Sequence, residues 1–224
     1  MSENNCTGRN GGRGCCGSCA PQIPIVTAFY TTGTRYEAEA ARLRSSLDKL
    51  GLRHWIIGVE DRGSWAANVK QTPEFLLRAM RHWSGQPIVY VDADAVFWRR
   101  PDLFAELSPA DHDIAAHYRA GQELLNGTLW LSNNAACERV IGTYWTLVVG
   151  NPKERNEQLF LDRAIKELKP RVYHLPAAYC WIHDVMANDL NGDEPVVEHL
   201  QASREEGSSW LASRRKRLAE IGAA

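Results

Sequence analysis

The chain of 224 residues lacks any apolar run close to the ~20 residues that a membrane-spanning helix needs. It also lacks a secretory signal, because its first twenty residues are polar and rich in glycine and contain no apolar core. We therefore expect a cytoplasmic protein, of a bacterium or of a phage-infected host. In that setting the glycosylation sequons at Asn5 and Asn126 carry no meaning.

An excess of charge of either sign is also missing. Lys and Arg together number 26 and Asp and Glu 27, so the net charge of −1 provides no general attraction to nucleic acids or membranes. A basic run at Arg214–Arg217 is typical of a solvated helix face, and contact with an anionic partner is the alternative. The content of 44% hydrophobic and 24% charged residues is that of a globular domain, and we see no internal repeat.

A second Cys-x-x-Cys pair is absent. Cys16 and Cys19 have the spacing of a zinc ligand pair, but they lie in a glycine-rich stretch that offers no packing. We favour a flexible, oxidation-prone tail over a metal site. The sequence thus predicts a tail at 1–22, one domain at 23–204 and a basic segment at 205–224.

The most informative stretch is the apolar run Ile88–Val91, which follows Pro87 and ends in Asp92 and Asp94. A continuous apolar run of this length predicts a strand buried on both faces. Asp is rare inside strands, so the pair indicates a loop that bears a site. Two carboxylates at i and i+2 can bind one hard cation where the backbone turns.

Strands and helices alternate along the first hundred residues, which favours an α/β domain with a mostly parallel sheet. Ligands of such sheets bind beyond the carboxyl ends of the strands, so Thr27–Gly33 and Asp92–Asp94 can share one crevice. A polar loop is expected up to Asn68, and Thr72 is expected to cap the next helix. We expect strands at 23–30, 55–59, 87–91, 114–116 and 125–132, and helices at 36–50, 72–83, 135–149 and 157–168.

Taken in order, these motifs resemble a nucleotide-sugar glycosyltransferase of the GT-A fold that contains an Asp-x-Asp motif. The resemblance covers about residues 23–200. It implies an α/β fold with a mostly parallel central sheet and helices on both faces, and transfer of a sugar from a nucleoside-diphosphate sugar, with UDP-hexose favoured, to an acceptor hydroxyl. It is carried by Thr27–Tyr30, Lys70, Ile88–Asp94, Leu125–Trp130, Asn156–Leu161 and Glu198–Leu200.

The resemblance further implies a divalent cation held by Asp92, Asp94 and His199. Such a cation acts as a Lewis acid toward the departing diphosphate. Mn²⁺ is favoured over Mg²⁺, because a histidine ligand suits manganese better. The alternative for His199 is a surface histidine near the end of the chain.

A donor pocket is the next implication of the resemblance. Residues of the first strand would contact the nucleotide base, basic residues would pair with phosphates, and an Asn-Gly turn would face the sugar. A plain hairpin turn is the alternative for the Asn-Gly pair. The expected donor-binding residues are Thr27, Tyr30, Arg35, Lys70, Asp92, Asn126 and Gly127.

For catalysis the resemblance implies Glu157 and Gln158 near the acceptor, with Asp184 as a second carboxylate. Glu157 would remove the acceptor proton in an inverting enzyme and orient the sugar in a retaining one, and the sequence leaves both open. The alternative for Glu157 is an exposed acid at a helix start, stabilised by the helix dipole.

Three other functions compete with this interpretation. Asp92 and Asp94 also match the first motif of haloacid-dehalogenase phosphohydrolases, with Asp92 as nucleophile, but the later acidic motif of that family is missing. A nucleotidyltransferase and a nucleotide-sugar-binding module without catalysis are the others. The acceptor remains open among a small molecule, a protein and a hydroxylated DNA base. Trp98–Arg100 and Arg214–Arg217 favour DNA, whereas the net charge opposes it.

Overall fold

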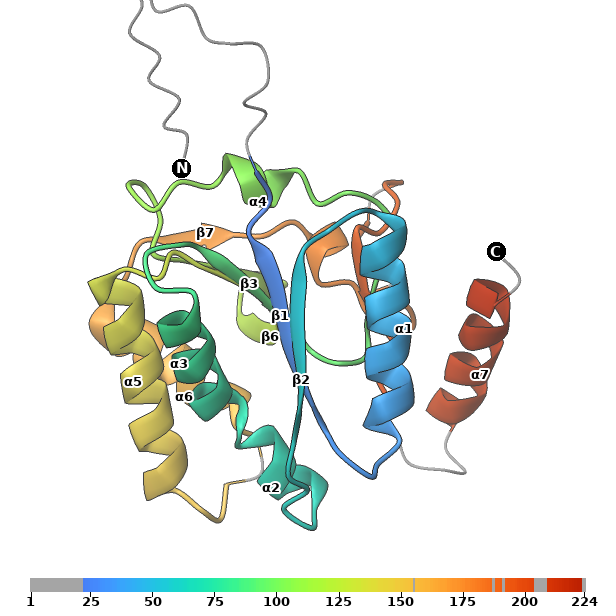
Figure 1. Cartoon of the computed structure of the whole chain (residues 1–224), viewed down its shortest axis with the longest axis horizontal. Coiled ribbons are helices and arrows are strands. Elements are labelled where there is room, and N and C mark those ends of the chain that lie inside the picture. The colour runs from blue at the N-terminus through green and yellow to red at the C-terminus, as the bar shows by residue number, and fades with distance from the viewer. Residues whose placement is uncertain (1–21, 155, 187, 191, 204–208, 223–224) are drawn as a thin grey trace, which may run out of the picture.

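The computed structural model describes residues 22–203, apart from 155, 187 and 191, and residues 209–222. Within these ranges six strands form a central sheet in the order β2-β1-β3-β6-β5-β7 (Figure 1). Strands run parallel in β1–β2, β1–β3 and β5–β7 and antiparallel in β3–β6 and β5–β6, so most pairings are parallel. The strands are β1 (Ile25–Thr31), β2 (His54–Val59), β3 (Ile88–Val91), β5 (Ile114–Arg119), β6 (Glu123–Leu131) and β7 (Val172–His174).

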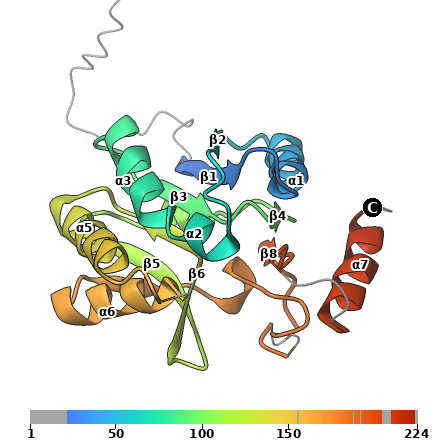
Figure 2. The same cartoon turned by 90° about the horizontal axis from the view of Figure 1, so that it is seen from below.

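Helices cover both faces of this sheet, as Figure 2 shows from below. They are α1 (Tyr36–Lys49), α3 (Thr72–His82), α4 (Leu103–Glu106), α5 (Ala135–Gly150) and α6 (Gln158–Leu168). Successive side chains of a strand point to opposite faces. In β3, Ile88 and Tyr90 pack with residues of α3, α5 and α6, whereas Val89 and Val91 pack with residues of α1 and α4. The expected α/β architecture is confirmed.

The chain leaves the central sheet at Asp92–Asp94 and forms a second, two-stranded sheet. Its strands, β4 (Ala95–Phe97) and β8 (Val197–His199), are antiparallel and come from opposite halves of the sequence. The 3-10 helix η1 (Ala177–Tyr179) precedes β8, and α7 (Ser209–Gly222) follows it. This small sheet therefore places a C-terminal strand beside the turn that carries both carboxylates.

Two local expectations in the region between β2 and β3 are wrong. The segment expected to be a polar loop contains α2 (Trp65–Val69), whose N-cap Ser64 accepts a hydrogen bond from the backbone N–H of Ala67. Thr72 does not cap α3 but is its first residue, and its hydroxyl donates to the carbonyl of Val69 at 2.7 Å. The hydroxyl therefore joins α3 to α2.

The Asn126-Gly127 pair forms no turn, contrary to expectation. Both residues lie inside β6, where the pairing with β5 shifts register and leaves residues 126–128 without partners on that strand. The turn of the β5–β6 hairpin is at Ala120 and Gly121, which both have positive φ. A bulge of this kind turns side chains out of the regular ladder and is frequent beside functional sites.

The expected tail at 1–22 lies outside the described residues except for Gln22, and so do Cys16 and Cys19. Of the described cysteines, Cys137 and Cys180 are buried and free.

Candidate donor pocket and metal site

Asp92, Asp94 and His199 meet where β3 ends. Each residue offers a ligand atom, and these atoms lie within 4.8 Å of one another. The contact depends on the β4–β8 ladder, in which Ala95 pairs with His199. His199 is 4% exposed, so its interpretation as a surface histidine is wrong.

Neighbouring groups orient each of these three side chains. The Tyr90 hydroxyl donates to Oδ1 of Asp92 at 2.8 Å, and the backbone N–H of Ala202 donates to Oδ2 of Asp94 at 2.7 Å. Nε2 of His199 lies 2.8 Å from the Thr128 hydroxyl. Its Nδ1 faces Oδ1 of Asp94 at 3.7 Å and has no hydrogen-bond partner among the described residues. Such outer contacts are how proteins fix the ligands of a metal.

Gly127 keeps the space between these ligands open. A Cβ atom at this position would lie 3.0 Å from Cε1 of His199, 3.2 Å from its Nδ1 and 3.3 Å from Oδ2 of Asp92. A side chain at this position would therefore fill the space between His199 and Asp92. An unpartnered buried imidazole nitrogen and two carboxylates around such a space fit a divalent cation.

The electrostatics of the cluster also fit a cation. Desolvation and the charge of nearby Asp94 raise the pKa of Asp92 to about 6, because two neighbouring carboxylates resist ionising together. A bound cation would remove this cost and hold both carboxylates ionised.

A cavity of about 230 Å³ opens from the cluster. It lies beyond the carboxyl ends of β1 and β3, where ligands of α/β sheets bind. The expected site residues that line it are Tyr30, Asp92, Asp94, Asn126, Glu157 and Gln158. We call this cavity the donor pocket.

Glu157 occupies the buried end of the donor pocket, just before α6. It is 9% exposed, so its interpretation as an exposed helix-start acid is wrong. Its Oε1 accepts a hydrogen bond from Nδ2 of Asn126 at 3.0 Å, and Oε1 of Gln158 accepts one from the Asn126 backbone N–H at 3.4 Å. Burial raises the pKa of Glu157 to about 7, and the nearby charge of Asp92 adds to this effect. The carboxyl therefore changes ionisation near neutral pH.

Two residues expected in the donor pocket lie elsewhere. Thr27 is fully buried, and its hydroxyl donates to the Val89 carbonyl at 3.0 Å, which ties β1 to β3. Nζ of Lys70 donates to the Pro152 carbonyl at 2.5 Å and faces a different cavity. Both residues are close along the chain to residues that line the pocket. The alternation of side chains along β1 directs Thr27 away from the pocket, and the position of Lys70 at the C-terminal end of α2 does the same for its side chain.

Arg35 and Asp184 also fail to line the donor pocket. Arg35 is exposed, and its guanidinium lies 5.7 Å from the ring centroid of Tyr36, which does line it. Asp184 borders a small cavity with Glu198 and Arg217, on the α7 side of β8. Arg35 is thus beside the pocket, and Asp184 is separated from it by the strand that carries His199.

Sequence reasoning missed several residues of the pocket. Trp65 is 46% exposed and belongs to α2, which was expected to be a loop. Tyr36 keeps its proton, since burial and the charge of Asp94 raise its pKa to about 12. Tyr90 could have been predicted from the sequence as a partner of Asp92, because residues two apart in a strand share a face and Asp92 follows at that spacing. Further lining residues are Asn68, Asn156, Gln201 and Ser203.

Two arginines of the basic run near the end of the chain turn inward. Arg217 donates to both carboxylate oxygens of fully buried Glu198 at 2.8 Å, and its guanidinium lies 5.0 Å from the Trp98 ring centroid. Arg214 donates to the Leu200 carbonyl at 2.9 Å and pairs with Glu39 of α1. These contacts hold α7 against the rest of the domain. Arg214 and Arg217 are therefore engaged within the protein and do not supply the phosphate contacts that the DNA-acceptor hypothesis requires.

The arginines after β4 are also engaged within the chain. Arg99 donates to the Glu194 carbonyl, and Nε of Arg100 lies 2.8 Å from Oδ1 of Asp102.

In the described part of the chain, no helix is both long and apolar enough to cross a lipid bilayer.

Solved structures of glycosyltransferases share the fold of this chain. Neither a family model nor a curated protein matches the chain. A glycosyltransferase involved in glycosylation of the major capsid of PBCV-1 matches with a TM-score of 0.61 and 12% identity over 88% of this chain and 100% of that one. GlyE of Streptococcus pneumoniae gives 0.60 and 12% over 89% and 64%.

The galactosyltransferase LgtC, solved with donor and acceptor sugar analogues, gives a TM-score of 0.56 and 12% identity over 88% of this chain and 95% of that one. At these identities the likeness shows the fold. It confirms the expected glycosyltransferase fold.

Proposed function

We propose that this protein is a metal-dependent glycosyltransferase that moves a sugar from a nucleoside-diphosphate sugar to an acceptor hydroxyl. The observation that carries the proposal is the cluster of Asp92, Asp94 and His199, whose two carboxylates line the donor pocket. The glycosyltransferase fold supports it, since ligands of such sheets bind at this edge.

In this proposal Asp92, Asp94 and His199 hold Mn²⁺ or Mg²⁺, with Mn²⁺ favoured by the histidine. When bound, the cation supplies Lewis-acid stabilisation to the departing diphosphate. Tyr90 and Thr128 orient Asp92 and His199 through the hydrogen bonds described above.

The donor lies along the pocket with its base toward Trp65 and Tyr30. The exposed indole of Trp65 offers a stacking surface, and the Tyr36 hydroxyl stays protonated as a donor for phosphate oxygens. Asn126 and Gln158 face the sugar. UDP-hexose is the favoured donor, since a galactosyltransferase is among the solved structures of this fold.

Glu157 is the proposed catalytic carboxylate. With a pKa of about 7 it can accept a proton from an acceptor hydroxyl near neutral pH, which suits an inverting reaction. In a retaining reaction the same carboxylate, held by Asn126, orients the sugar. The anomeric configuration of the product, read by NMR, separates these two roles.

The proposal is tested by calorimetric titration of UDP- and GDP-sugars with Mn²⁺ and with EDTA, followed by assay of the released nucleotide. We expect Mn²⁺-dependent donor binding and slow release of nucleoside diphosphate in the absence of an acceptor. Equal binding in EDTA, or in the Asp92→Asn/Asp94→Asn variant, would overturn the metal dependence. Release of inorganic phosphate indicates a phosphohydrolase, and binding without nucleotide release under any condition indicates a module without catalysis.

The proposal also includes a cytoplasmic setting, bacterial or in a phage-infected cell.

A further inference from the structure

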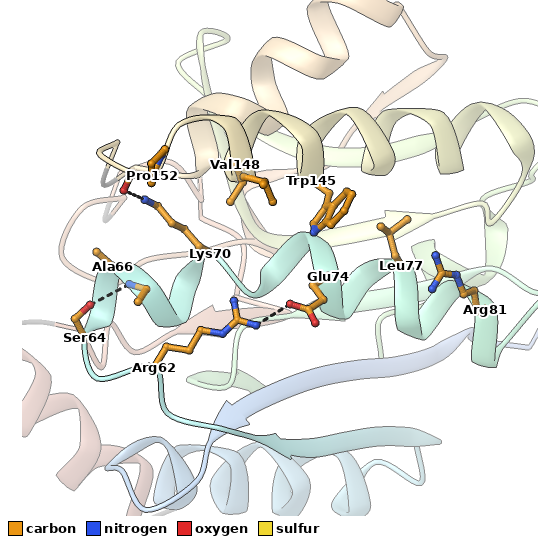
Figure 3. Close-up of a pocket in the computed structure, with 12 residues that line it drawn as sticks. Arg62, Ser64, Ala66, Lys70, Glu74, Leu77, Arg81, Trp145, Val148 and Pro152 are labelled. Atoms are coloured by element: carbon orange, nitrogen blue, oxygen red, sulfur yellow. Dashed lines mark hydrogen bonds and ion pairs between the residues drawn. The ribbon is translucent and has the colours of Figure 1, made fainter.

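A second and larger cavity, of about 810 Å³, lies between α2–α3 and α5 (Figure 3). We call it the α3–α5 groove. Its apolar lining includes Trp145, Val148 and Val149 of α5 and Leu77 of α3. Trp145 is 44% exposed and Val149 61% exposed, so a large apolar surface of α5 faces solvent here. Exposed apolar patches of this kind mark sites of interaction.

The rim of the groove is basic. Arg62, Lys70 and Arg81 line it, and Glu74 is the one acidic residue among its described lining (Figure 3). Arg62 pairs with Glu74 at 2.8 Å, so these two charges compensate each other. The bond of Lys70 is to the neutral Pro152 carbonyl, and Arg81 has no ion pair with any described residue. The positive charges of Lys70 and Arg81 therefore remain uncompensated by ion pairs with described residues, and they lie beside the apolar lining of the groove.

The groove and the donor pocket share their walls. On α2, Trp65 and Val69 line the donor pocket, whereas Ala66 and the C-cap residue Lys70 line the groove. The loop between α5 and α6 does the same: Pro152 lines the groove, and Asn156 and Glu157 line the donor pocket. The hydrogen bond from Lys70 to Pro152 joins the two walls where they separate the cavities. The groove and the donor pocket therefore lie on opposite sides of one shared wall.

We propose that the α3–α5 groove binds an acidic polypeptide segment of the acceptor, with an aromatic or branched apolar side chain on Trp145 and acidic side chains at Lys70 and Arg81. The identification of the bound peptide as part of the acceptor rests on the proposed function. The binding of a peptide rests on the groove alone. The floor is largely aliphatic, which suits peptide side chains. A glycan needs a dense set of free polar partners, and here Arg62 and Glu74 are engaged with each other. A nucleic acid needs many phosphate contacts, and the two uncompensated cations of the groove, Lys70 and Arg81, are too few for them.

The experiment selects peptides from a displayed library of random twelve-residue sequences on the immobilised full-length chain, in EDTA and without donor. We expect enriched peptides to combine Asp or Glu with an aromatic or branched apolar residue. Their binding is then measured by fluorescence anisotropy. Trp145→Ala and Arg81→Glu should each weaken it roughly tenfold or more, as loss of an interface anchor does. Leu168→Ala and Arg163→Glu, at exposed positions of α6, are the matched controls and should leave binding unchanged.

Two further readouts separate this inference from the proposed function. Release of nucleotide from the donor without acceptor should be the same in Trp145→Ala and Arg81→Glu as in the wild type, because neither residue lines the donor pocket. Sugar transfer to enriched peptides that carry a hydroxyl residue should fall in both variants. If the donor is never turned over but the peptides bind in a Trp145-dependent way, the proposed function fails and the peptide site stands.

Several outcomes would overturn the inference. The first is a library that yields no enrichment, and the second is enriched peptides that bind both groove variants like the wild type. The third is an acidic polysaccharide that binds the wild type but not Trp145→Ala while peptides do not bind. The fourth is Trp145-dependent self-association in light scattering, which would assign the groove to a second copy of the chain.

Discussion

Asp113 and Glu157 are both buried carboxylates, 3% and 9% exposed, but their partners differ. Asp113 lies at the start of β5 and accepts hydrogen bonds from Nη2 of Arg171 at 2.6 Å, from the Arg171 backbone N–H at 2.8 Å and from Nδ2 of Asn134 at 2.8 Å. These bonds hold the pKa of Asp113 well below its usual range, and the hydrogen bond from the Arg171 side chain contributes most to this effect. The Glu157 side chain accepts a hydrogen bond from the Asn126 amide, and burial raises its pKa to about 7.

The difference separates a carboxylate that holds the fold together from one that the fold leaves reactive. Asp113 joins the β5–β7 edge to the N-cap Asn134 of α5, and its charge is satisfied within the protein. Asp92 and Glu157 line a cavity, and their negative charge is poorly satisfied by the chain itself. Carboxylates of the second kind cluster at functional sites.

The largest expected effect comes from removing a charge at the metal cluster. Asp94→Asn should lower donor turnover roughly a thousandfold, because the cation that it helps to hold contributes several kcal/mol to the transition state. Asp113→Asn is the matched control at a buried aspartate and should keep turnover while lowering the thermal midpoint. The assay is nucleotide release at saturating Mn²⁺. Equal turnover losses in the two variants would erase the distinction between the two regions.

Glu157→Gln should lower turnover roughly a hundredfold, the range of a positioned acid or base. The wild-type rate should rise with pH through about 7, because Glu157 is ionised above its pKa and protonated below it. The variant should lose this part of the profile while donor affinity in Mn²⁺ stays close to that of the wild type. A pH profile of the same shape in wild type and Glu157→Gln would remove the catalytic role.

The unfolding free energy should depend on pH with opposite signs for the two carboxylates. The folded pKa of Glu157 is raised above its ordinary 4.5, so its contribution is fully present below that pH and is lost as the pH rises through about 7. Wild type in EDTA should therefore lose roughly 2–3 kcal/mol relative to Glu157→Gln between pH 4.5 and 8. Denaturant unfolding of both proteins across this range measures the difference.

For Asp113 the folded pKa is depressed, so its contribution is present above the ordinary 3.8 and is lost as the pH falls through the lower folded value. Asp113→Asn should therefore be less stable than the wild type at pH 7, and the gap should close in strong acid. A gap that widens on acidification would contradict the assignment of Asp113 as a satisfied ion pair.

The smallest expected effect tests space rather than charge. Gly127→Ala adds one methyl group between His199 and Asp92, and should weaken Mn²⁺ binding roughly tenfold with little change in stability. Titration followed by Mn²⁺ electron paramagnetic resonance measures the affinity. Gly142→Ala on α5, where a Cβ meets nothing within 4 Å, is the matched control. Unchanged affinity in Gly127→Ala would mean that the cation, if bound, lies elsewhere.

The sequence by itself determined what short-range patterns encode. The apolar run before Asp92 gave a buried strand, and the alternation over the first hundred residues gave the α/β class, because side-chain periodicity is a property of neighbouring residues. The paired carboxylates were recognisable by residue type and spacing, whereas Glu157 was expected from the resemblance to the glycosyltransferases. The five-residue helix α2 was missed because so short a segment has almost no periodicity, and Trp65 was missed with it.

The tertiary structure decided which of these residues meet. His199 reaches the carboxylates through a ladder between strands about a hundred positions apart, and a bulge, not a turn, brings Asn126 and Gly127 to the site. Lys70 is directed to Pro152 and Arg217 to Glu198 by partners that lie far away along the chain. Pairings of this kind depend on how elements pack and on which buried charge finds a counter-charge, and no local pattern in the sequence records either.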